Sequence, residues 1–183
     1  MKLEDKKIFL IGGKARNGKT TIGKMLKEEY EKQGYKVVIM QLMTPLKGYI
    51  KTYFNWDGQE ETKPRELLQK LGTEVIREKL GKKYFYVNRL IEDIEILSSF
   101  FDVFIIDDVR FKLEIDKIRE VFPFLKALKI IRRNYQSNLT EEQQQHISEI
   151  DLDDYEKVEY KIINDGTLEE LKEKIKQIVK EEF

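Results

Sequence analysis

The 183-residue sequence contains no cysteine, only three prolines and a single histidine. Without cysteine the chain can form neither disulfides nor cysteine-built zinc sites, and thiolate catalysis is excluded. The sequence also has no long hydrophobic run near its start, where the apolar run covers only residues 8–11. A run of that length is too short for a signal peptide or a membrane span. We therefore expect a soluble, cytoplasmic protein.

Neither sign of charge is in excess, because Lys plus Arg and Asp plus Glu number 34 each and the sequence pI is about 6.7. A nucleic-acid-binding protein usually carries a basic excess or a basic stripe. The composition shows no such excess, so we expect neither nucleic acid nor a membrane as a partner. The sequence leaves the oligomeric state open, a homodimer included.

Short apolar runs alternate with segments of helical length along the whole chain. Nearly continuous apolar runs are typical of parallel strands that are buried on both faces. The predicted strands are residues 8–11, 37–40, 103–106, 128–131 and 160–163. The alternation predicts an α/β fold with a five-stranded parallel sheet, right-handed crossovers and helices on both faces. No repeat or long linker interrupts it, so residues 1–183 are predicted to form one domain.

The segment at about 44–99 differs from the rest, because it contains about three helices and no convincing strand. A minimal core would need only one crossover helix at that point. We interpret the segment as a helical substrate-binding insertion in a core formed by residues 1–43 and 100–183.

Three helix starts are signalled by local sequence. At the first, Thr44 is predicted to cap a helix that begins with Pro45. The other two are capping boxes, in which a threonine and the residue three positions later satisfy each other's backbone groups. These pairs are Thr140 with Gln143 and Thr167 with Glu170.

The stretch GKARNGKT at residues 13–20 fits the phosphate-binding pattern G-x-x-x-x-G-K-[ST] at every fixed position. Its glycines let backbone N–H groups point at phosphate, and the following helix adds its N-terminal dipole. Lys19 is expected to reach the β- and γ-phosphates, and Thr20 to supply a hydroxyl to Mg²⁺. We thus predict bound ATP and Mg²⁺, with a nucleotide contacted by Gly13, Lys14, Ala15, Arg16, Asn17, Gly18, Lys19, Thr20 and Thr21.

A second chemical signal is the stretch FDVFIIDDVRF at residues 101–111, which reads as a buried strand ending in two acids. Carboxylates at the end of a strand beside the phosphate loop hold Mg²⁺ or its water shell in P-loop enzymes. Asp107 is the positional match, and Asp108 could share the task. Arg110 adds a cation where a second phosphate could lie. An ordinary strand-end turn is the structural alternative.

The rest of the chain narrows the kind of P-loop protein. It has no base-reading Asn-Lys-x-Asp segment, which a GTPase would need. In residues 62–81 a spacing of four places two arginines, a glutamine and a threonine on one stripe of a helix. These are Arg65, Gln69, Thr73 and Arg77, which could clamp a phosphate and contact a base edge. A solvated helix face is an equally simple interpretation.

Arg132 and Arg133 open a polar segment after the fourth predicted strand. Arginines on a mobile lid neutralise charge on a transferred phosphoryl group and exclude water. We therefore predict a short lid at about residues 132–148. It contains His146, the only histidine, which on its own is more typical of a surface or capping residue than of a catalyst.

Taken together, several segments resemble the bacteriophage-type deoxynucleoside monophosphate kinases. The resemblance extends from Ile8 to about Ile175. Its specificity comes from the combination of segments rather than from the loop alone, which many functions share. The segments are GKARNGKTT, TPLK, PRELLQKLGTEVIR, DDVRF, HISE and NDGTLEEL, in this order. The resemblance implies a P-loop kinase fold with an ATP site, a monophosphate site and a lid. It also implies transfer of the γ-phosphoryl group of ATP to a deoxynucleoside 5′-monophosphate.

The resemblance also implies roles for individual residues. The catalytic residues would be Lys19, Arg110, Arg132 and Arg133. The acceptor would be bound by Lys47, Arg65, Gln69, Arg77 and Arg110, with the glutamine near the base. Asn164, Gly166 and Thr167 would lie beside the adenine. The metal would be held by Thr20 together with Asp107 or Asp108.

Two alternatives stay open. One is a kinase of another phosphorylated small molecule, such as phosphomevalonate, whose kinases share a similar DVR segment. The segment after DVRF, Lys112-Leu113-Glu114, departs from the Pro-Asn-Glu of many deoxynucleoside monophosphate kinases and leaves this alternative open. The other is a regulatory or assembly protein that binds ATP without an acceptor. Such a protein would not need Arg65, Arg77 and Arg110 to converge on a second site.

Overall fold

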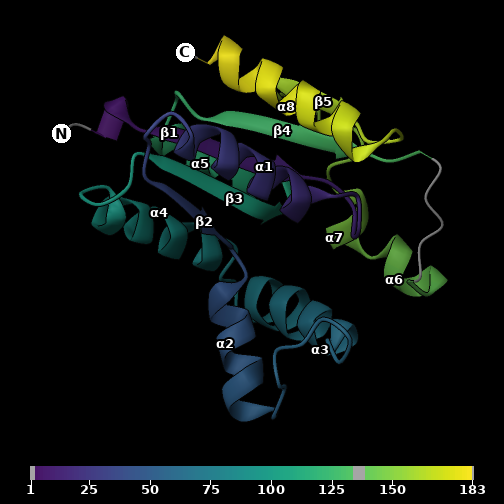
Figure 1. The fold of residues 1–183 in the computed structure, drawn as a ribbon. Helices are drawn as coiled ribbons and strands as arrows, with labels where there is room; N and C mark the ends of the chain where they lie inside the picture. Colours follow the sequence, from purple (N-terminus) through teal and green to yellow (C-terminus); the bar gives the residue numbers. More distant parts are fainter. Residues whose placement is uncertain (1–2, 134–138, 183) are drawn as a thin grey trace.

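The computed structural model describes residues 3–133 and 139–182. Its centre is a five-stranded, all-parallel sheet in the order β2-β3-β1-β4-β5, which confirms the predicted α/β fold (Figure 1). Each predicted strand is present, and each observed boundary lies within three residues of the predicted one. The strands are β1 (Lys7–Gly12), β2 (Val37–Met40), β3 (Val103–Val109), β4 (Lys126–Ile131) and β5 (Tyr160–Ile163).

Helices cover both faces of the sheet, so the strands contribute alternate residues to two cores. On β1, Ile8 and Leu10 pack into the core shared with α4 (Phe85–Leu97) and α5 (Lys112–Val121). Phe9 and Ile11 face the opposite core, shared with α1 (Lys19–Glu31) and α8 (Leu168–Glu181). All four β1 side chains are buried. Burial on both faces is the physical reason for the continuous apolar runs in the sequence.

Residues 44–79 form a helical arm that extends away from the sheet (Figure 1). The arm comprises α2 (Thr44–Tyr53), α3 (Arg65–Gln69) and a π-helix (Lys70–Lys79) that continues α3. The regular α-helical spacing assumed for residues 62–81 is therefore wrong from Lys70 onward, where hydrogen bonds span five residues. Gly72 lets the π-helix approach α2 closely, since a Cβ atom there would lie 2.8 Å from Leu46 Cδ2.

The start of α2 also differs from the sequence prediction. Thr44 is the first residue of the helix, and its hydroxyl donates to the Gln41 carbonyl at 2.8 Å instead of capping the helix. The N–H groups of Leu42 and Met43, which lie just before the helix, donate to the carboxylate of Asp108, at 2.7 and 3.1 Å. An acid at the end of β3 therefore ties the arm to the sheet. The capping boxes at Thr140 and Thr167 are confirmed.

Two short helices, α6 (Glu141–Gln145) and α7 (Ile147–Ile150), lie between β4 and β5, and a 3₁₀ helix (Leu3–Asp5) precedes β1. The predicted lid at 132–148 includes residues 134–138, which lie outside the described residues. Trp56, the only tryptophan, follows α2 and is partly buried against the core. Its indole N–H donates to the Gln59 carbonyl at 3.1 Å, and Lys51 Nζ lies 5.6 Å from its ring centroid.

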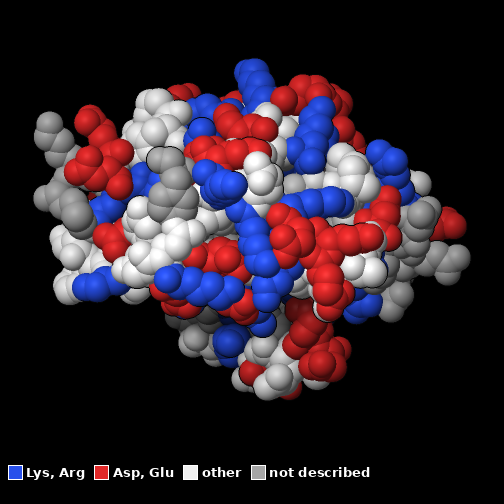
Figure 2. Space-filling model, turned by 45° about the horizontal axis from the view of Figure 1, so that its top comes forward, with Lys and Arg blue, Asp and Glu red and all other residues white. Residues whose placement is uncertain are grey.

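Basic and acidic side chains intermingle on the face of the molecule drawn in Figure 2, in keeping with the balanced composition. No helix within residues 3–133 and 139–182 combines the length and the apolar character that crossing a membrane requires.

The packing of α1 on the sheet gives a test of the fold. Leu26 on α1 is fully buried, and we expect Leu26→Ala to lower the free energy of unfolding by about 2–5 kcal/mol, because it leaves a cavity. Ile96 on α4 is 66% exposed, so Ile96→Ala is the control and is expected to change stability by about 0.5 kcal/mol or less. Urea denaturation measures both. Equal losses in the two variants would contradict this packing.

Candidate active site

The phosphate-binding pattern forms a tight loop between β1 and α1. Gly13 and Gly18 have positive φ angles of 146° and 99°. A Cβ atom would lie 2.6 Å from the Ile130 carbonyl oxygen at Gly13 and 2.6 Å from Asn164 Nδ2 at Gly18. Gly13 therefore requires glycine for conformational and for steric reasons, because it meets a backbone atom, and Gly18 requires glycine for its backbone conformation.

Lys19 lies within this loop. Its ammonium group donates to the carbonyls of Gly13 and Lys14, both at 2.7 Å, and the side chain is almost fully buried. Burial holds the pKa of Lys19 well below its ordinary value, and the positive charge of Arg110 lowers it further. The carboxylates of Glu149, Asp108 and Asp107 act in the opposite direction. The loop lysine is thus electrostatically coupled to residues from β3, from the turn after it, and from α7.

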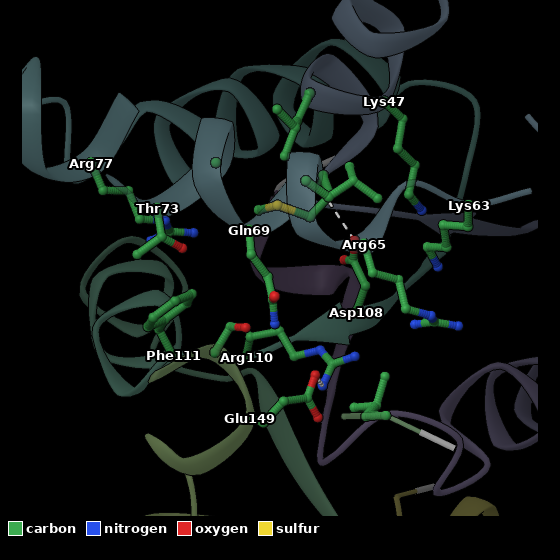
Figure 3. A pocket seen from close by; sticks show the side chains of 16 residues that line it. Lys47, Lys63, Arg65, Gln69, Thr73, Arg77, Asp108, Arg110, Phe111 and Glu149 are labelled. Carbon is green, nitrogen blue, oxygen red and sulfur yellow. Dashed lines mark hydrogen bonds and ion pairs between the residues drawn. The ribbon is translucent and has the colours of Figure 1, made fainter. Parts of the chain in front are cut away.

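A cavity of about 440 Å³, the loop cavity, lies over the phosphate loop. Loop residues and the start of α1 form one wall, and Gln41, Asp107 and Asp108 form another. A second cavity of about 140 Å³, the helix cavity, lies between the helical arm and the end of β3 (Figure 3). The residues that line it include Arg65, Gln69, Thr73, Arg77 and Arg110. The structure therefore brings the predicted helix stripe and the strand-end arginine into one cavity.

The two cavities share part of their lining. The shared residues are Lys47, Lys63, Arg65, Asp108 and Arg110, of which four are cations. We call these four the shared cations. Figure 3 shows Lys47, Lys63 and Arg65 projecting from the arm on the same side as Asp108, with Arg110 facing them from the end of β3. A border with this charge can contact negatively charged groups in both cavities at once.

A bulge in β3 explains why two consecutive acids line the same cavity. Leu10 pairs with Ile106, but Gly12 pairs with Val109, so β3 has one residue more than β1 over this stretch. Successive residues of a regular strand point to opposite faces, and a bulge re-aims a side chain. Asp107 and Asp108 both line the loop cavity as a result.

The two acids have different partners. Asp107 is almost fully buried, and its Oδ1 accepts a hydrogen bond from Gln41 Nε2 at 2.9 Å. Its Oδ2 is buried without a hydrogen-bond partner among the described residues. Burial raises the pKa of Asp108 to about 6, against the lowering effects of the Lys47 charge and the two backbone N–H donors.

Three of the shared cations, Arg65, Lys63 and Lys47, have polar side-chain partners. Arg65 Nη2 pairs with Glu60 Oε1 at 2.6 Å, and Lys63 Nζ pairs with the other oxygen of Glu60 at 2.9 Å. Lys47 Nζ donates to Gln41 Oε1 at 2.5 Å. Burial lowers the pKa of Lys47, and the charge of Lys63 lowers it further. These contacts hold three of the four shared cations at the border between the two cavities.

Arg77 is much more deeply buried than the shared cations. Its Nη2 pairs with Glu114 Oε1 at 2.5 Å, and its guanidinium lies 4.2 Å from the Phe111 ring centroid and 5.1 Å from that of Tyr86. Its Nη1 is buried with no hydrogen-bond partner among the described residues. Glu114 is fully buried, and its other oxygen accepts from the N–H groups of Arg110 and Phe111 at 2.8 and 3.0 Å.

The residues predicted to lie near the adenine and in the lid are more scattered. Asn164 donates to the Asn17 carbonyl at 2.9 Å and so supports the loop. Thr167 caps α8, and Gly166 precedes it on the surface. Arg132 lines a third cavity of about 270 Å³, which also touches Gly13 and Arg110. The exposed Arg133 donates its backbone N–H to Asp165 at 2.7 Å.

Sequence reasoning missed several residues of the site. Lys63 precedes the PRELLQ segment, and Glu149 ends the HISE segment, but neither was assigned a role. Glu114 lies three residues after Phe111, where an acid commonly reaches back to the start of a helix. That local signal could have identified Glu114 as a structural residue, but not its contact with Arg77.

Comparisons with known proteins agree with this geometry. The model of a family described as deoxynucleotide monophosphate kinase matches residues 50–175, which is more than half of the chain. A search among curated protein sequences found no match.

Solved structures with the same architecture include the APS kinase of Mycobacterium tuberculosis, at 9% identity and a TM-score of 0.55, covering 96% of this chain and 98% of that one. The shikimate kinase of Aquifex aeolicus has 14% identity and a TM-score of 0.51, with 96% and 97% covered. The gluconokinase of Sinorhizobium meliloti has 14% identity and a TM-score of 0.51, with 96% and 92% covered. The fold is thus that of the P-loop kinases.

The buried pair between Arg77 and Glu114 gives a test of the site. We expect Glu114→Ala to lower the free energy of unfolding by about 3–5 kcal/mol, because it leaves the Arg77 charge buried and unpaired. Glu120 lies on the same helix and forms an exposed pair with Lys117, so Glu120→Ala is the control, with an expected cost of about 1 kcal/mol or less. Thermal and urea unfolding measure both. A Glu114 variant as stable as the control would contradict the structural role of this pair.

Proposed function

Because this chain belongs to the deoxynucleotide monophosphate kinase family, we propose that it transfers the γ-phosphoryl group of ATP to a deoxynucleoside 5′-monophosphate, giving the diphosphate. The observation that carries this proposal is the border between the loop and helix cavities, with its four shared cations. A protein that only bound ATP would need the loop cavity but not a second cavity lined by arginines.

The donor is proposed to bind in the loop cavity. Backbone N–H groups of the phosphate loop, other than that of Ala15, which donates to Glu149, would hold its phosphates together with the N-terminus of α1. Lys19 would contact the β- and γ-phosphates from within the loop, as its burial there suggests. For the adenine, Asn164, Gly166 and Thr167 remain a proposal. Of these three, Asn164 has a direct contact with the loop.

The residues around the loop cavity fit a magnesium ion. Thr20, Asp107 and Asp108 offer oxygen atoms on one cavity, and the unpartnered Oδ2 of Asp107 supports a ligand role. Mg²⁺ is commonly held by one or two carboxylates together with substrate phosphates. The described residues contain no group of three or more His, Asp or Glu side chains arranged to hold a metal by themselves. When bound, Mg²⁺ would neutralise charge on the phosphates of the donor.

The acceptor is proposed to bind in the helix cavity. Its phosphate would face the shared cations, and its base would lie deeper, near Gln69 and Thr73. Leu46 and Phe111 are apolar parts of the same lining and would contact the base and sugar. A largely apolar cavity with a few polar groups is typical of sites for small molecules. Arg77 lines this cavity, with Glu114 and two aromatic rings fixing its guanidinium.

The reaction would then require positioning and charge stabilisation rather than proton abstraction. The attacking atom is an acceptor phosphate oxygen, which is already anionic, so no general base is needed. Holding two negatively charged phosphates in line is the main energetic task, and arginine and lysine side chains serve it. Arg110 is the central candidate, because it borders the loop cavity, the helix cavity and the third cavity.

An assay of ADP formation with ATP, Mg²⁺ and a panel of acceptors tests the proposal. The panel contains dGMP, dTMP, dAMP, dCMP, CMP and phosphomevalonate. We expect at least one deoxynucleoside monophosphate to be converted to its diphosphate in an amount equal to the ADP formed. Turnover of phosphomevalonate alone, or ADP release without a phosphorylated product, would contradict the proposed acceptor.

Lys19→Ala, assayed with the best acceptor, is expected to lower kcat at least about 100-fold, because it removes a buried charge from the transition state. Lys24 is an exposed lysine on the same helix, so Lys24→Ala is the control and should keep near wild-type activity. Thermal unfolding checks that both variants are folded. A Lys19 variant as active as the control would contradict the proposed donor site.

The pKa of Asp108 predicts a pH dependence. Burial raises this pKa to about 6, so Asp108 gains a proton as the pH falls through about 6. The site then loses a negative charge that would support the metal, and kcat/KM is expected to fall on the acid side with a midpoint near pH 6. The positive charge of Lys47 lowers this pKa, so Lys47→Met should move the midpoint to higher pH.

The control for this shift is Lys51→Met, which removes an exposed lysine from the same helix and should leave the midpoint in place. pH profiles of kcat/KM for the wild type and both variants measure the effect. A midpoint that stays fixed or moves to lower pH in Lys47→Met would exclude Asp108 as the group responsible.

A further inference from the structure

Glu149, on the short helix α7, contacts two parts of the site that are distant in sequence. Its Oε2 accepts from the Ala15 N–H of the phosphate loop at 2.8 Å, and its Oε1 accepts from Arg110 Nη1 at 2.8 Å. The side chain is only 9% exposed. Figure 3 shows the Glu149 carboxylate directly beside the Arg110 guanidinium. One carboxylate therefore links the loop, the turn after β3 and α7.

The backbone of α7 is fixed near both ends. His146 Nδ1 accepts from the Ser148 N–H at 3.2 Å and so caps the start of the helix. Asp151, which follows the helix, accepts from the Lys112 N–H at 2.7 Å. The next residue, Leu152, is buried in the core. Glu149 is thus presented from an anchored segment rather than from a free surface turn.

The position of Glu149 relative to the cavities indicates what it does. It lines the helix cavity and the third cavity but not the loop cavity, whereas Arg110 lines all three. Glu149 therefore lies outside the loop cavity, in which the phosphates of the donor are proposed to bind. An arginine has five N–H donors, so binding one side of the guanidinium to Glu149 leaves further donors for phosphates.

Resting on the kinase activity proposed above, we propose that Glu149 is a positioning residue for phosphoryl transfer. It fixes the Arg110 guanidinium against the phosphate loop, at the border between the donor and acceptor cavities. A side chain that is held in place before the substrates bind loses less conformational freedom in the transition state. Glu149 acts through Arg110 and does not itself contact the transferred group.

The chemistry of the carboxylate determines the choice of variants. Glu149→Gln keeps the shape of the side chain but offers one acceptor oxygen and one NH₂ donor. Ala15 and Arg110 donate to different oxygens of Glu149, so in the glutamine variant the NH₂ group faces one of these two donors and that hydrogen bond is lost. Glu149→Asp keeps the charge and both acceptors but is shorter by one methylene group. Glu142 is an exposed acid on the neighbouring helix α6, so Glu142→Gln is the matched control.

Steady-state kinetics with the best acceptor test the proposal. We expect Glu149→Gln to lower kcat about ten- to a hundredfold, because misplacing Arg110 disturbs the transition state. The KM for ATP should change less than about threefold, since Glu149 itself does not line the loop cavity. The kcat of Glu149→Asp should fall between those of Glu149→Gln and the wild type. Glu142→Gln should behave like the wild type, and thermal unfolding checks that every variant is folded.

A second comparison separates positioning from a merely structural role. In an Arg110→Ala background, Glu149→Gln should cost less than about twofold, because the group through which it acts is gone. An equal loss in both backgrounds would overturn the proposal. A higher kcat or a lower KM for ATP in Glu149→Gln would also overturn it, since the carboxylate would then be competing with the donor.

A spectroscopic measurement keeps this inference distinct from the proposed function. The Arg110 side-chain Nε–H signal, assigned with Arg110→Lys, can be followed in ¹⁵N-labelled protein without any substrate. We expect the signal to shift in Glu149→Gln and to stay in place in Glu142→Gln. If none of the acceptors is phosphorylated, the proposed function fails while this measurement still tests the contact. An unchanged signal in Glu149→Gln would overturn the positioning role.

Discussion

The rest of the site depends on the ion pair and the two hydrogen bonds that the buried Glu114 carboxylate makes. A charge removed from water is tolerated only if it is paired and its remaining hydrogen bonds are made. Glu114 meets this condition with Arg77 from the π-helix and with two backbone N–H groups at the end of β3. The same bonds join the helical arm to the sheet and set the direction in which the chain leaves the strand at Arg110.

Around this anchor, three of the four shared cations are paired with a glutamate, and the fourth donates to a glutamine side chain. Glu60 holds Arg65 and Lys63, Gln41 holds Lys47, and Glu149 holds Arg110. Each partner fixes a side chain without enclosing it, because Lys47, Lys63, Arg65 and Arg110 all line both main cavities. Charges held in this way are preorganised, which lowers the cost of arranging them around phosphates.

The parts of the structure that could be predicted are those encoded by local sequence. Strands buried on both faces appear as apolar runs, the phosphate loop as glycines at fixed positions, and two helix starts as capping boxes. The misses depend on distant residues. Asp108 accepts from the two N–H groups just before α2, the bulge in β3 aims two acids into one cavity, and Glu149 is 39 residues from its partner Arg110. No local pattern encodes such contacts.

The place of Trp56 has a practical consequence for spectroscopy. The chain contains one tryptophan, and it lies in the arm, three residues after the end of α2. Its indole is partly buried, donates to the Gln59 carbonyl and lies near Lys51. Tryptophan emission from this protein therefore originates in the arm alone, and the sheet contributes none. The molecule carries a built-in fluorophore in the element that lines the helix cavity, without any added label.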